Sequence, residues 1–124
     1  MRPNRKESRV LNVTRTDNDQ VTVLRLEGDI DEGGMDSLRR ELMDCVREQR
    51  CNVEVNLAGG RFVSYMGLGV LVERLRQLRA HNGDLKLAGV NLYTQRLIRM
   101  VGAKNVFEIF EVESQAVGQF RQAA

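Results

Sequence analysis

The stretch that decides the fold is Asn56-Leu-Ala-Gly-Gly-Arg-Phe-Val-Ser-Tyr-Met-Gly-Leu-Gly69. It overlaps residues 53–57, Val-Glu-Val-Asn-Leu, which predict a short strand. Residues 58–60 then predict a loop, residues 61–63 are strand-like, and Gly67-Leu-Gly69 begins a helix. Apolar residues recur every three or four positions after this point, so a strand leads here into an amphipathic helix.

Two strands and a helix are predicted before this stretch. Residues 10–14 alternate between apolar and polar side chains, residues 17–20 are typical of a turn, and residues 21–27 form the clearest strand, ending at Gly28. The chain therefore opens with a hairpin, and its second strand is aliphatic enough for a central position. A helix follows Gly33-Gly34, and its apolar face consists of Met35, Leu38, Leu42, Cys45 and Val46.

The helix that begins near Gly67 is predicted to end at His81-Asn82-Gly83. Its expected buried stripe is Leu68, Leu71, Val72, Leu75 and Leu78, and its expected solvent side is Glu73, Arg74, Arg76, Gln77 and Arg79. Residues 84–88 form the next strand. Asn91 is a suitable cap for a third helix, which Gly102 stops and whose expected apolar face is Tyr93, Leu97, Met100 and Val101. A strand at residues 106–110 and a helix at residues 112–120 complete the chain.

This order of elements defines the fold class. Strands that alternate with helices imply right-handed crossovers and a parallel sheet, to which the opening hairpin adds an antiparallel edge. We expect an α/β fold in a single domain, with a mixed, mostly parallel sheet of about five strands and four helices. The expected domain covers residues 10–120, between a flexible basic tail at residues 1–9 and a short tail at residues 121–124.

Composition agrees with one compact domain. The chain has 124 residues, 42% of them hydrophobic, which suffices for one core at that size. We find no apolar window long enough to span a bilayer and no apolar signal-peptide region, so we expect a cytoplasmic protein without a membrane partner. Cys45 and Cys51 are expected to be free thiols, because a reducing compartment disfavours a disulfide and no histidine lies near enough for a zinc site.

The excess of positive charge lies at the N-terminus. Four basic residues stand against one acidic residue in residues 1–9, a surplus of three, and the net charge of the whole chain is +2. The remainder is therefore at −1, and we expect no nucleic-acid partner. The basic segment is either a solvated, mobile end or an electrostatic arm for an acidic partner.

Catalytic and ligand-binding chemistry is sparse. The one histidine, His81, is expected to bond a carbonyl at a helix end or to face water. Asp29, Asp31 and Glu32 are a cation site or, alternatively, negative charge at a helix N-terminus. Gly67-Leu-Gly69 is either an anion or nucleotide site or a close contact between helix and sheet. We therefore expect no enzyme, no metal and no cofactor.

Four segments resemble the STAS family of anti-sigma factor antagonists. Residues 56–69 resemble its Asp-Leu-Ser strand end followed by Phe-Ile-Asp-Ser-Ser-Gly-Leu-Gly at the start of a helix. Gly28-Asp-Ile-Asp31 looks like the family's Gly-x-Leu-Asp, Leu85-Lys-Leu-Ala-Gly-Val90 like its next strand, and residues 97–107 like its Leu-x-x-x-Gly-Leu-x-x-x-Phe. The resemblance covers residues 10–120 and agrees with the order of elements derived above.

The resemblance implies a protein partner and a switch. Such a domain binds an anti-sigma factor with a histidine-kinase-like ATPase fold, which phosphorylates a serine at the helix start and thereby ends the association. A phosphate adds about −1.5 to −2 charge in the middle of a docking surface, which brings repulsion and a desolvation penalty. The implied partner-binding residues are Asn56, Arg61, Phe62, Ser64, Tyr65, Met66 and Gly67.

The sequence departs from the family at the acceptor site itself. Aligned through Gly67, the motif Asp is Ser64, the phosphoacceptor serine is Tyr65 and the second Ser/Thr is Met66, while Asn56 replaces the strand-end Asp. Because a tyrosine ring carries its hydroxyl several ångströms further out, a kinase built for serine would not find its acceptor. We expect a binding module that keeps the fold and lacks the usual switch.

Alternatives remain at this stage. A slide of one residue could present Ser64 to the kinase, and Met66 either packs in the core or joins Tyr65 in an apolar contact patch. The whole chain could instead be a scaffold or a homo-oligomer in a signalling complex, or bind a small anion near Gly67.

Overall fold

The computed structural model describes residues 10–123, with the backbone alone for residues 60–61 and 121–123. The predicted tail at residues 1–9 lies outside this range. The strands are β1 (Asn12–Asn18), β2 (Val21–Ile30), β3 (Asn52–Val63), β4 (Asp84–Ala88) and β5 (Glu108–Phe110). The helices are α2 (Glu32–Arg47), α3 (Tyr65–Ala80), α4 (Leu92–Met100) and α5 (Glu113–Ala123).

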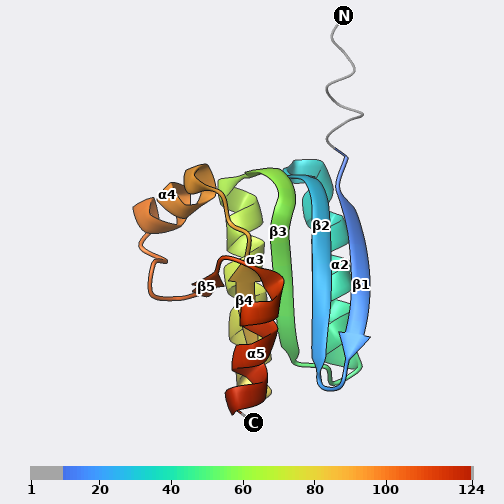
Figure 1. Ribbon diagram of the computed structural model, residues 1–124. Coiled ribbons are helices and arrows are strands. Elements are labelled where there is room, and N and C mark those ends of the chain that lie inside the picture. The colour runs from blue at the N-terminus through green and yellow to red at the C-terminus, as the bar shows by residue number, and fades with distance from the viewer. Residues whose placement is uncertain (1–9, 124) are drawn as a thin grey trace, which may run out of the picture.

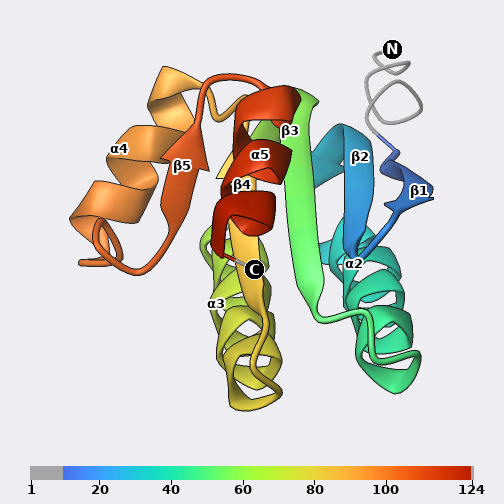
Figure 2. The ribbon, with the colours of Figure 1, turned by 60° about the horizontal axis from the view of Figure 1, so that its bottom comes forward.

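The strands form one sheet in the order β1-β2-β3-β4-β5. β1 pairs antiparallel with β2, and every other neighbouring pair is parallel, as the alternation of strands and helices predicted (Figure 1). Helices α2 and α3 lie side by side against one face of the sheet, and α5 crosses the other face (Figure 2). The predicted mixed α/β fold with five strands and four helices is therefore confirmed in residues 10–123.

The main core lies between the sheet and the pair α2 and α3. Side chains alternate between the two faces of a strand, so Leu24 and Leu26 of β2 and Val53 and Val55 of β3 all point to this side. Their partners on the helices include Leu38, Leu42, Leu71, Leu75 and Leu78, each with no exposed side chain. The apolar stripes predicted for the first two helices thus form this core.

The opposite face of the sheet carries charged groups beneath α5. Phe120 of α5 packs with Val21 and Val23, and the Lys86 ammonium lies 4.7 Å from the centre of its ring. Arg25 of β2 holds Glu113 of α5 through two hydrogen bonds of 2.8 and 2.9 Å. Bidentate guanidinium–carboxylate pairs fix orientation well, so this pair anchors the first turn of α5 to the sheet.

Glu113 is also held by a second strand. Asn56 of β3 donates from Nδ2 to its carboxylate at 3.1 Å. Burial alone would raise the pKa of Glu113, but the hydrogen bonds from Arg25 and Asn56 outweigh that effect and lower it. Glu113 is therefore ionised at neutral pH and remains available as the anchor of α5.

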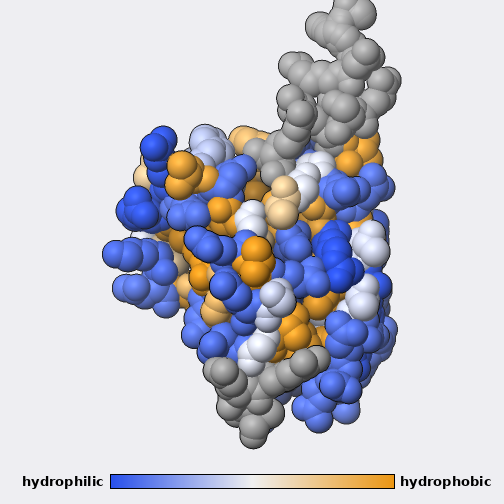
Figure 3. Space-filling model, viewed as in Figure 1, coloured by the Kyte–Doolittle hydropathy of each residue, from blue (hydrophilic) through white to orange (hydrophobic). Residues whose placement is uncertain are grey.

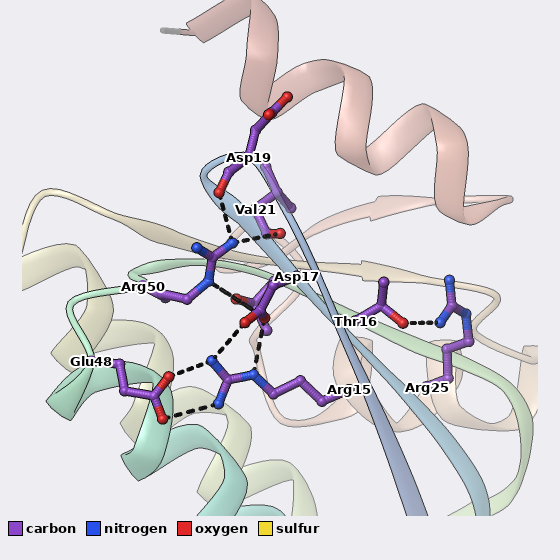
Figure 4. Close-up of polar contacts among 9 residues, drawn as sticks. Arg15, Thr16, Asp17, Asp19, Val21, Arg25, Glu48 and Arg50 are labelled. Atoms are coloured by element: carbon purple, nitrogen blue, oxygen red, sulfur yellow. Dashed lines mark hydrogen bonds and ion pairs between the residues drawn. The ribbon is translucent and has the colours of Figure 1, made fainter.

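A network of ion pairs and hydrogen bonds lies beside the turn between β1 and β2 (Figure 4). Arg15 bonds Asp17 and Glu48, and Arg50 donates to Thr22 Oγ1 at 2.6 Å and to the carbonyls of Asp19 and Val21. The pKa of Asp17 is lowered chiefly by its hydrogen bond with Arg15. The network ties the β1–β2 turn to the end of α2.

Several element boundaries differ from the predictions. Residues 58–60, predicted as a loop, are strand, because Glu27 and Gly28 of β2 pair with Gly59 and Gly60. A Cβ on Gly59 would lie 2.9 Å from the Glu27 side chain, so glycine here permits close strand packing rather than a turn. β1 reaches Asn18 and so takes up part of the predicted turn, and α5 continues to Ala123, past the expected domain end.

The buried faces of α3 and α4 also differ from the predictions. Arg74 was expected in solvent but is 8% exposed and donates to Gln77 at 2.6 Å. In α4 the buried residues are Thr94, Leu97 and Ile98, so the helix is rotated from the predicted stripe. Tyr93, Met100 and Val101 are consequently exposed.

Candidate functional site at the start of helix α3

Ser64 caps helix α3. Its backbone is extended, with φ −78° and ψ 166°, and its Oγ accepts a hydrogen bond from the Gly67 N–H at 2.9 Å. Its own N–H donates to the Ile30 carbonyl at 3.0 Å, and its carbonyl accepts from Leu68 at 2.9 Å. A serine hydroxyl in this position satisfies one of the otherwise unpaired N–H groups at a helix start. The residue is therefore fixed by three bonds, two of the main chain and one of the side chain.

Tyr65 and Met66 project into solvent from the first turn. Their exposed fractions are 59% and 62%, so the alternative that Met66 packs in the core is wrong. Phe62, at the end of β3, is also exposed and its ring stacks on Tyr93 of α4, with centroids 6.2 Å apart. Large apolar side chains held in water by a rigid helix start are typical of a binding surface.

The two glycines of α3 occupy different surroundings. A Cβ on Gly67 would lie 2.7 Å from Ile30 Cγ2 and 2.8 Å from the Ile30 carbonyl oxygen, so contact with the sheet requires glycine there. A Cβ on Gly69 would meet no atom within 4 Å. The packing explanation for this motif therefore holds for Gly67 and fails for Gly69.

We expect Gly67→Ala to lower the free energy of unfolding by about 2 kcal/mol, because the new methyl group displaces the end of β2 from α3. The matched variant Gly69→Ala should raise it by up to about 1 kcal/mol, since alanine favours a helix and nothing opposes its Cβ. Urea unfolding of both variants measures the difference. Equal effects of the two substitutions would contradict the assigned packing.

Asn56 does not join the other predicted site residues. It lies within β3, and Val63, the residue before Ser64, ends that strand. Its side chain is half-buried beneath α5, where Nδ2 contacts Glu113 and Oδ1 accepts from the Ala58 N–H at 2.8 Å. Arg61 lies in β3 near the site, but only its backbone is described. The structure thus brings together Phe62, Ser64, Tyr65, Met66 and Gly67.

Of the remaining candidates, Asp29 is buried near the end of β2, and the other four described next have structural explanations. Asp31 caps α2 by accepting from Gly34 N–H at 3.0 Å, and Glu32 lies in the first turn of that helix. The ring of His81 contacts the Gln77 carbonyl at 2.9 Å, one of the two predicted outcomes. Cys45 is a buried free thiol whose pKa is raised by burial to about 11. Within residues 10–123, no three potential metal ligands come together.

Sequence reasoning missed an apolar surface on α4. Leu92, Tyr93, Met100 and Val101 are 44% to 71% exposed, and Tyr93 connects them to Phe62. The stripe that the structure buries, Thr94, Leu97 and Ile98, has equally good helical spacing but begins with a polar residue. Buried Thr94 also donates its N–H to the Asn91 cap at 2.8 Å.

These features define a class of protein. A mixed sheet covered by two helices on one face leads through β3 into a capped helix, and exposed aromatic and apolar side chains surround that cap. The arrangement is that of a small α/β binding domain. The STAS domain family model matches residues 12–116, and the chain belongs to that family.

The known proteins of similar sequence and structure include anti-sigma factor antagonists. The anti-sigma F factor antagonist of Paenibacillus polymyxa is 26% identical over 98 residues, which cover 78% of this chain and 84% of that protein. An anti-sigma factor antagonist from Mycobacterium paratuberculosis has the same fold, with a TM-score of 0.81 and 21% identity over 90% of this chain and 94% of its own. The phosphorylated Bacillus cell fate determinant SpoIIAA has a TM-score of 0.70 and 17% identity. The match covers 89% of this chain and 98% of that chain. Among residues 10–123, no helix combines the length and apolar character needed to cross a bilayer.

Proposed function

We propose that this chain is an anti-sigma factor antagonist that binds an anti-sigma factor with a histidine-kinase-like ATPase fold. The family membership and the P. polymyxa relative support this function. The observation that carries it is the exposure of Phe62, Tyr65 and Met66 around a rigid helix start. We name these three residues, with Tyr93, the α3 docking surface. Aromatic and methionine side chains are enriched in the interfaces between proteins.

We further propose that binding is constitutive. The family's phosphoacceptor position is occupied by Tyr65, and the neighbouring hydroxyl of Ser64 accepts the Gly67 N–H. A slide that presents Ser64 to a kinase would break this cap and the two main-chain hydrogen bonds of the same residue. This arrangement favours a domain without the serine switch over one in which the switch has moved by one residue.

The proposal predicts a strong effect of charge on the α3 docking surface. Tyr65→Glu should weaken binding of the organism's anti-sigma factor at least 100-fold, because it removes a contact ring and buries a carboxylate in the interface. Gln115→Glu adds the same charge on exposed α5 and should leave the affinity unchanged. Isothermal titration calorimetry measures both. Equal affinities for the natural chain and Tyr65→Glu would exclude this surface, and absence of binding by the natural chain would exclude the function.

A further inference from the structure

A groove lies along α3, beside the α3 docking surface. One wall is a single stripe of the helix formed by Tyr65, Leu68, Gly69, Val72, Glu73 and Arg76. The other wall is the segment that follows α4, with Val101, Gly102, Ala103 and Val106. Its volume is about 620 Å³. At 1.5 Å per residue the stripe from Tyr65 to Arg76 is about 16 Å long, the length of three helical turns.

The α3 wall of this groove contains a glycine that the fold does not require. Glycine within a helix destabilises it by about 1 kcal/mol relative to alanine. Gly69 nevertheless is exposed, and an added Cβ would meet nothing within 4 Å. Gly67, two residues earlier, is required by Ile30. The absence of a side chain at Gly69 therefore leaves room for a backbone that approaches α3 from outside.

The segment that leads into the second wall of the groove is positively charged. Residues 92–104 contain Arg96, Arg99 and Lys104 and no acidic residue, and Arg76 lies in the groove wall. All four side chains are exposed, and none forms an ion pair with a carboxylate of residues 10–123. Glu73 is the one carboxylate among the lining residues. Over α4, at the upper left of Figure 3, strongly hydrophilic and hydrophobic residues lie next to each other.

From the shape, the open space at Gly69 and the charge, we propose that the groove binds an acidic amphipathic helix of the anti-sigma partner. Its apolar stripe would lie along Gly69 and Val72, and its acidic side chains would face Arg76, Arg96 and Lys104. An amphipathic helix in an apolar groove is a common mode of recognition, and opposite charges at the rim accelerate association. This inference rests on the proposed function and adds the chemistry of the partner's binding segment.

The first test fills the groove. Gly69→Trp should weaken binding of the purified anti-sigma factor at least tenfold, and Gly69→Ala should weaken it less, because a methyl group occupies far less of the partner's space than an indole. Urea unfolding establishes that both variants remain folded. If Gly69→Trp binds as tightly as the natural chain, the groove is not the binding site. If light scattering instead shows a dimer of this chain that Gly69→Trp dissociates, the occupant is a second copy and the proposal is wrong.

The second test reverses charge. Arg96→Glu with Lys104→Glu should weaken the complex at least tenfold at low salt, while Arg40→Glu on exposed α2 serves as the control and should have little effect. Overlapping peptides of the anti-sigma factor identify the bound segment, which should carry excess Asp and Glu beside apolar residues at helical spacing. Tighter binding after reversal, or a basic bound peptide, would overturn the assignment. Failure of the natural chain to bind would instead refute the proposed function.

Discussion

In urea, the Glu54→Gln variant is expected to be about 3 kcal/mol more stable than the natural chain at pH 7, and only about 1 kcal/mol more stable at pH 5. Glu54 lies in β3 beneath α5 and is completely buried, and neither carboxylate oxygen has a hydrogen-bond partner within the described residues. Burial and, to a smaller extent, the negative charge of Glu113 raise its pKa from 4.5 to about 8, while Arg25 acts in the opposite direction.

The sign of the pH effect follows from this raised pKa. Between pH 4.5 and about 8 the unfolded chain loses the Glu54 proton, whereas the folded chain retains it. Stability therefore falls as the pH rises through that range and levels off above it. Glutamine is neutral at every pH in the range, so it removes this contribution.

Measuring urea unfolding at pH 5, 6, 7 and 8 tests the prediction. The stability difference between Glu54→Gln and the natural chain should grow with pH, whereas exposed Glu111→Gln should track the natural chain throughout. A difference that stays constant with pH would show that Glu54 does not titrate as described. If Glu54→Gln were less stable than the natural chain, burying the unpaired amide would cost more free energy than burying the acid.

The second large effect concerns the acceptor position. The double variant Ser64→Asp with Tyr65→Ser should gain one phosphate from the anti-sigma factor and ATP, and should then lose at least 100-fold in affinity for it. Aspartate is as good a helix cap as serine, so α3 should remain intact. Asn56 is left unchanged, because an aspartate there would face the Glu113 carboxylate that Asn56 now bonds.

Intact-mass spectrometry measures the modification. Ser64→Asp with Tyr65→Ala is the control and should gain nothing, since it has no hydroxyl at position 65. If the natural chain gains a phosphate that Ser64→Ala removes, the switch has moved by one residue and the proposal of constitutive binding is wrong. If the rebuilt variant binds the partner without being modified, position 65 is not presented to the kinase.

The order of elements could be predicted from sequence because strand and helix periodicities differ clearly in this chain. The continuation of β3 through Gly59-Gly60 could not, since paired glycines are typical of loops, and only the contact with Glu27 shows why the strand needs Gly59. The rotation of α4 was equally hidden. The predicted stripe and the observed stripe share helical spacing, and packing against the rest of the fold decides between them.

The site was predictable only in part. The motif placed Ser64, Tyr65 and Gly67 at a helix start, where the structure has them. Residues 53–57 alternate between aliphatic and polar side chains, a pattern that gives no sign that α5 covers the polar face. The resemblance groups Asn56 with the binding residues because Asn56 aligns with the family's strand-end Asp, and it gives no reason to single out Glu54. The cover that α5 provides is a long-range contact, which local patterns do not encode.

The central claim is that this chain binds an anti-sigma factor without a serine switch. Calorimetry with the purified partner, before and after incubation of the natural chain with that partner and ATP, tests it most directly. We expect the same dissociation constant in both titrations and no gain of phosphate. A weaker complex after incubation, together with a phosphate on Ser64 or Tyr65, would contradict the claim, as would the absence of binding in the first titration.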